Sequence, residues 1–220
     1  MIVAVVNEKG GSGKTTLAIN LACKLKQEGD SILFIDSDPQ KSGEVFTMIR
    51  KTEGIKEAFK YMAETENLLD LLKNNVDKFD VIVVDTGGRD SRESREALSV
   101  ADIVLVPVYP SQYDLAVLNN MLELVERARE AGNIESKCYI IISRAFTNAS
   151  LQNKIREFRE LLLSKKRAGV WLLDSILYDR EAFRMATTQG LGITEMPTQS
   201  KAKQEFNAVF KEILKKYKKE

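Results

Sequence analysis

The sequence has no histidine, two cysteines and four prolines, and each scarcity excludes a class of protein. Without histidine, His-based general-base catalysis and the usual His-containing zinc sites are not available. Cys23 and Cys138 are too few for a disulfide framework and suit the reduced core thiols of a cytoplasmic protein. So few prolines argue against a long Pro-rich linker. The groups that catalyse or bind a ligand must therefore be Lys, Asp and Thr side chains and backbone amides.

Long apolar segments and an excess of charge are also missing. No uninterrupted apolar run approaches the ~20 residues of a membrane-spanning helix, and the N-terminus lacks the features of an export signal. The 33 Lys and Arg residues nearly balance the 32 Asp and Glu residues, so the net charge points to neither nucleic acid nor membrane. The length predicts one α/β domain over residues 1–220.

Short apolar runs rich in β-branched residues alternate with helical patterns along the chain. The runs are continuous rather than alternating, which is typical of strands buried on both faces. Repeated strand and helix units predict parallel pairing through right-handed crossovers. We therefore expect an α/β fold, a doubly wound and mainly parallel sheet with helices on both faces. The expected strands are Ile2–Val6, Ser31–Ile35, Val81–Val84, Ile103–Val108, Tyr139–Ile142 and Trp171–Leu177, and the clearest helices are Leu17–Glu28 and Leu115–Ala131.

A Gly-rich segment, Asn7–Thr16, joins the first expected strand to the first expected helix. Its three glycines let backbone amides approach a phosphate closely, and the positive end of the helix points at the same place. The segment therefore predicts a phosphate-binding loop. The residues expected to bind the nucleotide are Lys9, Gly10, Gly11, Ser12, Gly13, Lys14, Thr15 and Thr16.

Three side chains of this loop have separate expected roles. Lys14 would neutralise charge on the β- and γ-phosphates, and the Thr15 hydroxyl would bind Mg²⁺. Thr16 is placed to reach the α-phosphate.

Carboxylates follow the next two expected strands. Asp36 and Asp38 come after the second strand, and Asp85 ends the third apolar run. Ligands of doubly wound sheets bind beyond the carboxyl ends of the strands, so these side chains should meet at one crevice. Asp85 is the expected Walker B carboxylate, which holds Mg²⁺ through water, and the two glycines at 87 and 88 permit a mobile switch segment. Without the phosphate loop, Asp36 and Asp38 would be explained equally well as turn residues before a proline.

The phosphate loop resembles that of the ParA/MinD superfamily of deviant-Walker P-loop ATPases. That family has Lys-Gly-Gly-x-Gly-Lys-Thr followed by Ser or Thr, and Lys9 through Thr16 match it throughout, whereas the general P-loop pattern would need glycine in place of Glu8. The resemblance implies ATP and Mg²⁺ as cofactors and a homodimer that encloses two ATP molecules. It also implies that Lys9 crosses the dimer interface to the partner's phosphates. Such a lysine would act like an arginine finger, offsetting charge on the transferred phosphoryl group.

Two later segments extend the resemblance. Phe34–Gln40 looks like the family's Asp-x-Asp-Pro-Gln switch segment, in which Asp38 would position the attacking water and Asp36 would support the Mg²⁺ shell. Pro107–Leu115 is similar to a family segment near the dimer interface, although helix capping by Ser111 or Asp114 explains it as well. The expected catalytic residues are Lys9, Lys14 and Asp38, and the expected metal-binding residues are Thr15, Asp36 and Asp85.

The functional classes within this superfamily differ in their C-terminal third, so that part of the sequence indicates the class. Cys23 and Cys138 do not lie where the redox iron proteins hold their cluster, which excludes that class. Tyr178–Gly190 resembles a stretch of the partition ATPases in which an arginine precedes a helix, and it implies contacts to DNA without sequence preference. Each basic residue concerned is also explained as an ordinary surface cation. The expected DNA-binding residues are Arg180, Arg184, Lys201 and Lys203.

The last helical pattern, Gln204–Lys219, is amphipathic and has three possible roles. It could pack on the sheet, face DNA with its lysines, or bind a membrane; its apolar face looks needed to cover the sheet, so no stable membrane association is expected. The resemblance therefore implies a ParA-type partition ATPase without an N-terminal helix-turn-helix domain, cytoplasmic and nucleoid-associated, that binds duplex DNA and is stimulated by a centromere-binding ParB-like partner. A ParA-like ATPase that positions a protein assembly, a MinD-like membrane-associated ATPase and an ATP-dependent ligase remain alternatives.

Overall fold

A parallel sheet runs through the centre of the molecule. The computed structural model describes residues 1–64, 66–164 and 167–219. These residues form a seven-stranded sheet in the order β3-β2-β4-β1-β5-β6-β7, and all neighbouring strands are parallel. The strands are β1 (Ile2–Val5), β2 (Ile32–Asp36), β3 (Lys60–Ala63), β4 (Val81–Asp85), β5 (Ile103–Val108), β6 (Lys137–Ile142) and β7 (Val170–Leu172).

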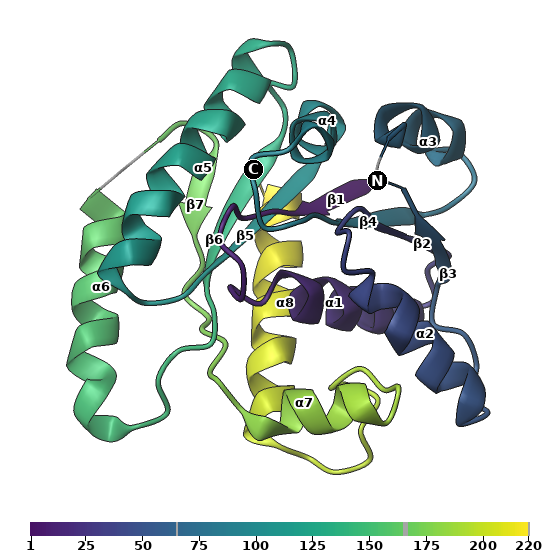
Figure 1. The fold of residues 1–220 in the computed structure, drawn as a ribbon. Coiled ribbons are helices and arrows are strands. Elements are labelled where there is room, and N and C mark those ends of the chain that lie inside the picture. The colour runs from purple at the N-terminus through teal and green to yellow at the C-terminus, as the bar shows by residue number, and fades with distance from the viewer. Residues whose placement is uncertain (65, 165–166, 220) are drawn as a thin grey trace.

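Helices cover both faces of the sheet, as Figure 1 shows. One face carries α1 (Lys14–Glu28), α2 (Ser42–Thr52), α7 (Glu181–Thr188) and α8 (Lys201–Lys219). The other face carries α3 (Leu68–Asn75), α4 (Arg92–Val100), α5 (Gln112–Glu130) and α6 (Gln152–Ser164), the last preceded by a short 3₁₀ helix, η1 (Ala149–Leu151). The predicted fold class, a doubly wound parallel α/β sheet, is confirmed.

The strands are apolar throughout because their side chains alternate between two buried cores. In β1, Val3 and Val5 belong to the core on the side of α1 and α8, whereas Ile2 and Ala4 belong to the core on the side of α4 and α5. Each core removes apolar surface from water, which stabilises the fold by about 25 cal/mol for each Å² buried. The continuous apolar runs therefore reflect two buried faces, as predicted.

Two strand predictions were wrong in detail. The edge strand β3 was not predicted, because its four residues are partly or fully exposed and form no apolar run. The strand predicted at Trp171–Leu177 is too long, since β7 ends at Leu172. Beyond it, the backbone N–H groups of Asp174 and Ser175 donate to the Glu212 carboxylate of α8, at 2.7 and 2.8 Å, instead of pairing with β6.

The last helix packs against the sheet. Phe206, Val209, Phe210 and Ile213 of α8 are all buried in the core that they share with α1. This is the first of the three roles considered for the helix, and it uses the apolar face. Among the described residues, no helix combines the length and the apolar character needed to cross a membrane.

Candidate functional site

The phosphate loop lies where the sequence placed it, between β1 and α1. Gly11 and Gly13 both have left-handed backbone conformations, with φ of 76° and 98°. A Cβ atom at Gly13 would come within 2.9 Å of the Ser143 Oγ atom, so the position has no room for a side chain. Gly13 also precedes the first residue of α1, which directs the N-terminus of that helix to the loop.

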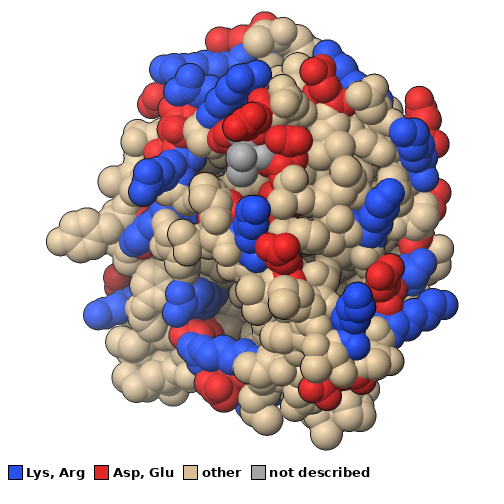
Figure 2. Space-filling view, turned by 45° about the vertical axis from the view of Figure 1, so that its right-hand side comes forward, with Lys and Arg blue, Asp and Glu red and all other residues tan. Residues whose placement is uncertain are grey.

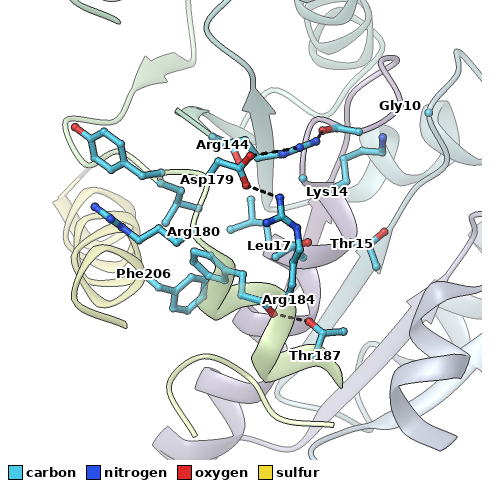
Figure 3. A pocket seen from close by; sticks show the side chains of 18 of the residues that line it. Gly10, Lys14, Thr15, Leu17, Arg144, Asp179, Arg180, Arg184, Thr187 and Phe206 are labelled. Atoms are coloured by element: carbon cyan, nitrogen blue, oxygen red, sulfur yellow. Dashed lines mark hydrogen bonds and ion pairs between the residues drawn. The ribbon is translucent and has the colours of Figure 1, made fainter. Parts of the chain in front are cut away.

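A cavity of about 590 Å³ opens beside this loop. Its walls come from the loop and the start of α1, from Asp38 and Gly88, from Arg144, and from α7 and the segment before it. Figure 3 shows Lys14 and Thr15 at the right of this space, Arg180 and Phe206 at the left, and Arg184 between them. The fold therefore brings the N-terminal motif and the C-terminal third to one site.

Lys14 is held inside the loop. Its side chain is buried, and the Nζ atom donates a hydrogen bond to the Lys9 carbonyl at 3.1 Å. Burial lowers the pKa of Lys14, while the nearby carboxylates of Asp85 and Asp38 act in the opposite direction. These carboxylates offset part of the cost of burying the ammonium charge beside the cavity.

Asp85 has the properties of a metal-binding carboxylate. It is fully buried, and among the described residues neither side-chain oxygen forms a hydrogen bond of good geometry, although the Thr15 hydroxyl and Lys14 lie nearby. Burial raises the pKa of Asp85 to about 8, against smaller opposing effects from the Thr15 hydroxyl and Lys14. An unpartnered buried carboxylate is unfavourable by itself, so this position fits a cation.

The remaining groups at the site fit Mg²⁺ in particular. The described residues contain no group of three or more His, Cys, Asp or Glu side chains arranged to hold a metal ion. Mg²⁺ needs no such cage, because it is commonly held by one or two carboxylates together with phosphate oxygens and water. Thr15 and Asp85, beside a phosphate loop, therefore suit a magnesium ion that arrives with a nucleotide.

Asp36 and Asp38 have different surroundings. The buried Asp36 carboxylate accepts hydrogen bonds from the backbone N–H groups of Asp38, at 3.1 Å, and Gly43, at 2.9 Å. Burial raises the pKa of Asp36, and these two hydrogen bonds lower it in part. Asp38 is only half-buried and lines the cavity. Asp36 therefore holds the segment that carries Asp38 to the cavity.

The segment after β4 packs directly on the phosphate loop. A Cβ atom at Gly88 would approach the Gly10 backbone nitrogen to 3.1 Å, which is tighter than most real contacts. The absence of a side chain at Gly88 thus allows the two backbones to meet. A change in the conformation of the phosphate loop would therefore move this segment through direct contact.

Lys9 contacts a residue of its own chain in this structure. The Lys9 Nζ atom lies 2.5 Å from the Asp114 Oδ2 atom, and Asp114 is almost completely buried in the first turn of α5. Ser111 caps this helix, its Oγ accepting the Asp114 N–H at 3.2 Å. The structure assigns the cap to Ser111, and it gives Asp114 a role that was not predicted, as the partner of Lys9.

The four expected DNA-binding residues differ in their contacts. Arg180 forms an ion pair with Glu205 at 2.7 Å, and Arg184 pairs with Glu181 at 2.7 Å. Both arginines line the cavity. The Lys203 Nζ atom donates to the Met196 carbonyl at 2.8 Å, whereas Lys201 is exposed at the start of α8.

The sequence analysis did not assign Arg144 and Asp179 to the site, although both line the cavity. Arg144 follows β6 and Asp179 follows β7, and the two side chains approach each other (Figure 3). Arg144 belongs to no motif recognised in the sequence, and Asp179 lies in the Tyr178–Gly190 stretch but was given no role there. Only the positive φ of Arg144, which is a property of the folded chain, marks the position as unusual.

Sequence comparisons agree with the phosphate loop and the sheet. The profile of the family described as AAA domain matches residues 1–76, and that of ATPase MipZ matches residues 44–123. A maintenance of carboxysome distribution protein A from Gloeobacter kilaueensis is 31% identical over 196 residues, covering 88% of this chain and 84% of that protein. Protein ParA of Rhizobium radiobacter is 29% identical over 182 residues, covering 83% of this chain and 80% of that protein.

A solved structure shows the same fold. A substituted McdA of Cyanothece in complex with ATP superposes with a TM-score of 0.76 at 19% sequence identity, covering 96% of this chain and 95% of that chain. Since its carboxysome-distribution relative is 31% identical along most of both chains, the chain belongs to the ParA/MinD superfamily of P-loop ATPases.

Proposed function

We propose that this chain is a ParA-type ATPase, a nucleotide-timed switch that dimerises with ATP and binds duplex DNA. Residues 1–220 would form a single P-loop ATPase domain. In the cell the protein would be cytoplasmic and associated with the nucleoid. A partner protein bound to the cargo would stimulate hydrolysis and release the dimer from DNA.

The observation that carries this proposal is the unpartnered Asp85 carboxylate beside the phosphate loop. Thr15 and Asp85 would hold Mg²⁺, and Asp36 would support them from the switch segment. Bound Mg²⁺ would supply positive charge to the phosphates. Lys14 would bind the phosphates, and Asp38, which lines the cavity, would orient the attacking water.

The position of Lys9 supports a dimer because its side chain is partly exposed at the loop. Its side chain is 38% exposed although it is paired with Asp114. A cation in this place could leave its own subunit and reach the phosphates of a second copy. The active site would then be complete only in the dimer, and hydrolysis would depend on dimerisation.

A row of exposed side chains along α8 supports binding to duplex DNA. Exposed positions recur every three or four residues, and they extend for about 25 Å at the helical rise. In the part of the chain that the structure describes, no ion pair involves any of the four lysines in this row. The row consists of Lys201, Gln204, Ala208, Lys211, Lys215 and Lys218.

Such a row suits contacts with the phosphate backbone of DNA, which need positive charge and do not depend on the base sequence. Figure 2 shows basic and acidic side chains interspersed over the face that it displays, with several basic ones gathered at its upper left. The near-neutral net charge is therefore compatible with local basic surfaces. Arg180, Arg184 and Lys203 would add to DNA binding only after giving up their present contacts, and Lys201 is free to do so now.

The cargo has two candidates. A plasmid or chromosome, bound by a centromere-binding ParB-like protein, is the first. A protein assembly is the second, and the name of the Gloeobacter relative, a maintenance of carboxysome distribution protein, favours it.

A salt-titrated duplex-binding assay with ATP, with ADP and without nucleotide tests the proposal. We expect binding with ATP and Mg²⁺ only, with an affinity that falls steeply as salt is added. Equal binding in all three nucleotide states would contradict the switch. ATP-dependent binding to anionic vesicles but not to DNA would instead support a MinD-like membrane function, and turnover of a carboxylate substrate by a monomer would support a ligase.

A further inference from the structure

Arg144 occupies a backbone conformation that residues with a Cβ atom rarely adopt. Its φ is 52°, and among the described residues only one other non-glycine residue has a positive φ. Backbone hydrogen bonds of the residues before and after Arg144 fix this conformation. The Ser143 N–H donates to the Val108 carbonyl at 2.8 Å, and the Ala145 N–H donates to the Leu177 carbonyl at 3.0 Å.

This backbone directs the Arg144 side chain across the phosphate loop. The Nη1 atom donates a hydrogen bond to the Gly11 carbonyl at 2.6 Å, over 133 residues of sequence. A Cβ atom at Gly13 would lie 3.8 Å from the Arg144 Cγ atom, so the aliphatic part of the side chain also passes close to the loop. The dashed lines in Figure 3 show Arg144 between the loop and Asp179.

Asp179 forms an ion pair with the other end of the guanidinium. Its Oδ2 atom lies 3.6 Å from Arg144 Nη2, and its Oδ1 atom accepts a hydrogen bond from Arg184 at 3.1 Å. The Asp179 N–H donates to the Ala145 carbonyl at 2.9 Å, so the two segments that carry Arg144 and Asp179 are tied together. Arg144 is therefore oriented by Asp179 and contacts the phosphate loop.

The contact with Gly11 has a consequence for the next amide. The Gly11 carbonyl and the Ser12 N–H belong to one planar trans peptide, in which the two groups point in opposite directions. Holding the Gly11 oxygen therefore fixes the direction of the Ser12 N–H. Glycine on either side of Ser12 would otherwise let this peptide rotate with little resistance.

We propose that Arg144 is a positioning residue, which fixes the Gly11–Ser12 peptide so that the loop is ready for phosphate before the nucleotide arrives. Asp179 orients Arg144 in this role. The part that concerns nucleotide rests on the proposed ATPase function, whereas the order of the loop can be measured without nucleotide. Pre-organised amides bind phosphate more tightly because less ordering remains to be done on binding.

The geometry requires arginine rather than lysine. The guanidinium presents two separate nitrogens, one to Gly11 and one to Asp179, and its planar shape holds both contacts together. A lysine ammonium could reach one of them but would not hold both in a fixed direction. The variants Arg144→Ala, Arg144→Lys and Asp179→Asn therefore form a graded series, and Arg156→Ala on the exposed face of α6 is a matched control.

Hydrogen exchange of the nucleotide-free protein is the first measurement. We expect Arg144→Ala to speed exchange about tenfold in peptides that cover residues 10–14, the scale expected when one charged hydrogen bond is removed. Arg144→Lys and Asp179→Asn should show smaller increases in the same peptides, and Arg156→Ala should show none. Unchanged exchange in the loop of Arg144→Ala would overturn the proposal. Faster exchange along the whole chain, with a lower unfolding temperature, would also overturn it, because it would indicate a general structural role.

Binding of a fluorescent ATP analogue is the second measurement. We expect the Kd to rise about tenfold in Arg144→Ala, with partial rescue in Arg144→Lys. If the wild type binds no ATP, the proposed function fails, and the exchange experiment still decides the role of Arg144. If the wild type binds ATP and Arg144→Ala binds it equally well, the role of Arg144 in nucleotide binding is refuted while the proposed function stands.

Discussion

The ammonium group of Lys9 lies 2.5 Å from the buried carboxylate of Asp114, so the lysine of the phosphate loop is paired within its own chain. If Lys9 is to reach the phosphates of a second copy, it must exchange this contact for the new one. The Ser111 hydroxyl also donates to the same carboxylate oxygen. Asp114 would therefore keep one hydrogen bond when Lys9 leaves, which limits the penalty of the exchange.

Replacing Lys9 should separate dimer function from nucleotide binding. We expect Lys9→Ala to lower ATP hydrolysis by about a hundredfold or more, the scale of losing a group that stabilises transition-state charge. Binding of ATP to a single subunit should change little, because Lys14 and the loop amides remain. Hydrolysis at the wild-type rate would show that Lys9 has no role across an interface, and Lys26→Ala, in the last turn of α1, is the control.

Replacing Asp38 should slow chemistry more than binding. Asp38 lines the cavity, and a group that positions water contributes only once ATP is bound. Asp38→Ala should therefore slow hydrolysis by roughly a hundredfold and accumulate an ATP-bound dimer, detected by size-exclusion chromatography. A variant that stays monomeric with ATP and Mg²⁺ would count against this role.

Replacing Asp85 should abolish the effect of Mg²⁺ without unfolding the protein. Asp85→Asn removes a carboxylate whose burial is unfavourable and only partly offset by Thr15 and Lys14, so the nucleotide-free variant should be at least as stable as the wild type. Mg²⁺-dependent hydrolysis should fall on the order of a hundredfold or more. The test compares unfolding temperature with hydrolysis at increasing Mg²⁺, and retained stimulation by Mg²⁺ would place the metal elsewhere.

Reversing charge along α8 should weaken DNA binding. The double variant Lys211→Glu and Lys215→Glu should bind duplex DNA more weakly at low salt, and the slope of log affinity against log salt should become shallower by about one for each phosphate that the protein no longer neutralises. Lys73→Glu, an exposed charge reversal on α3 at the opposite face of the sheet, is the matched control. Equal effects of the two changes would indicate general electrostatics rather than a binding surface.

The Glu212 contact predicts a loss of stability in acid. Burial alone would raise the pKa of Glu212, but hydrogen bonds from the N–H groups of Asp174 and Ser175 lower it below its ordinary value of 4.5. A carboxyl whose pKa is lower in the folded state stabilises fully above the unfolded-state value, and this contribution disappears as pH falls through the folded-state pKa. In urea denaturation, the wild type should therefore exceed Glu212→Gln in stability above pH 4.5, and the difference should shrink below that pH. A difference that is independent of pH would refute this origin.

The sequence by itself determined the parts of this protein that depend on neighbours along the chain. The loop from Lys9 to Thr16 is recognisable because its glycines, lysines and threonines are adjacent in the sequence, where a strand gives way to a helix. The buried strands are recognisable because both of their faces are apolar. The edge strand β3 lacks that pattern, and it was missed for that reason.

Only the tertiary structure decided which distant side chains meet. Lys9 and Asp114 are 105 residues apart, and they pair because β1 lies beside β5 in the sheet. Arg144 reaches both Gly11 and Asp179 because the segments after β6 and β7 are joined at Ala145 and Tyr178. Strand order is set by the packing of the whole core, so residue spacing along the chain carries no direct record of these contacts.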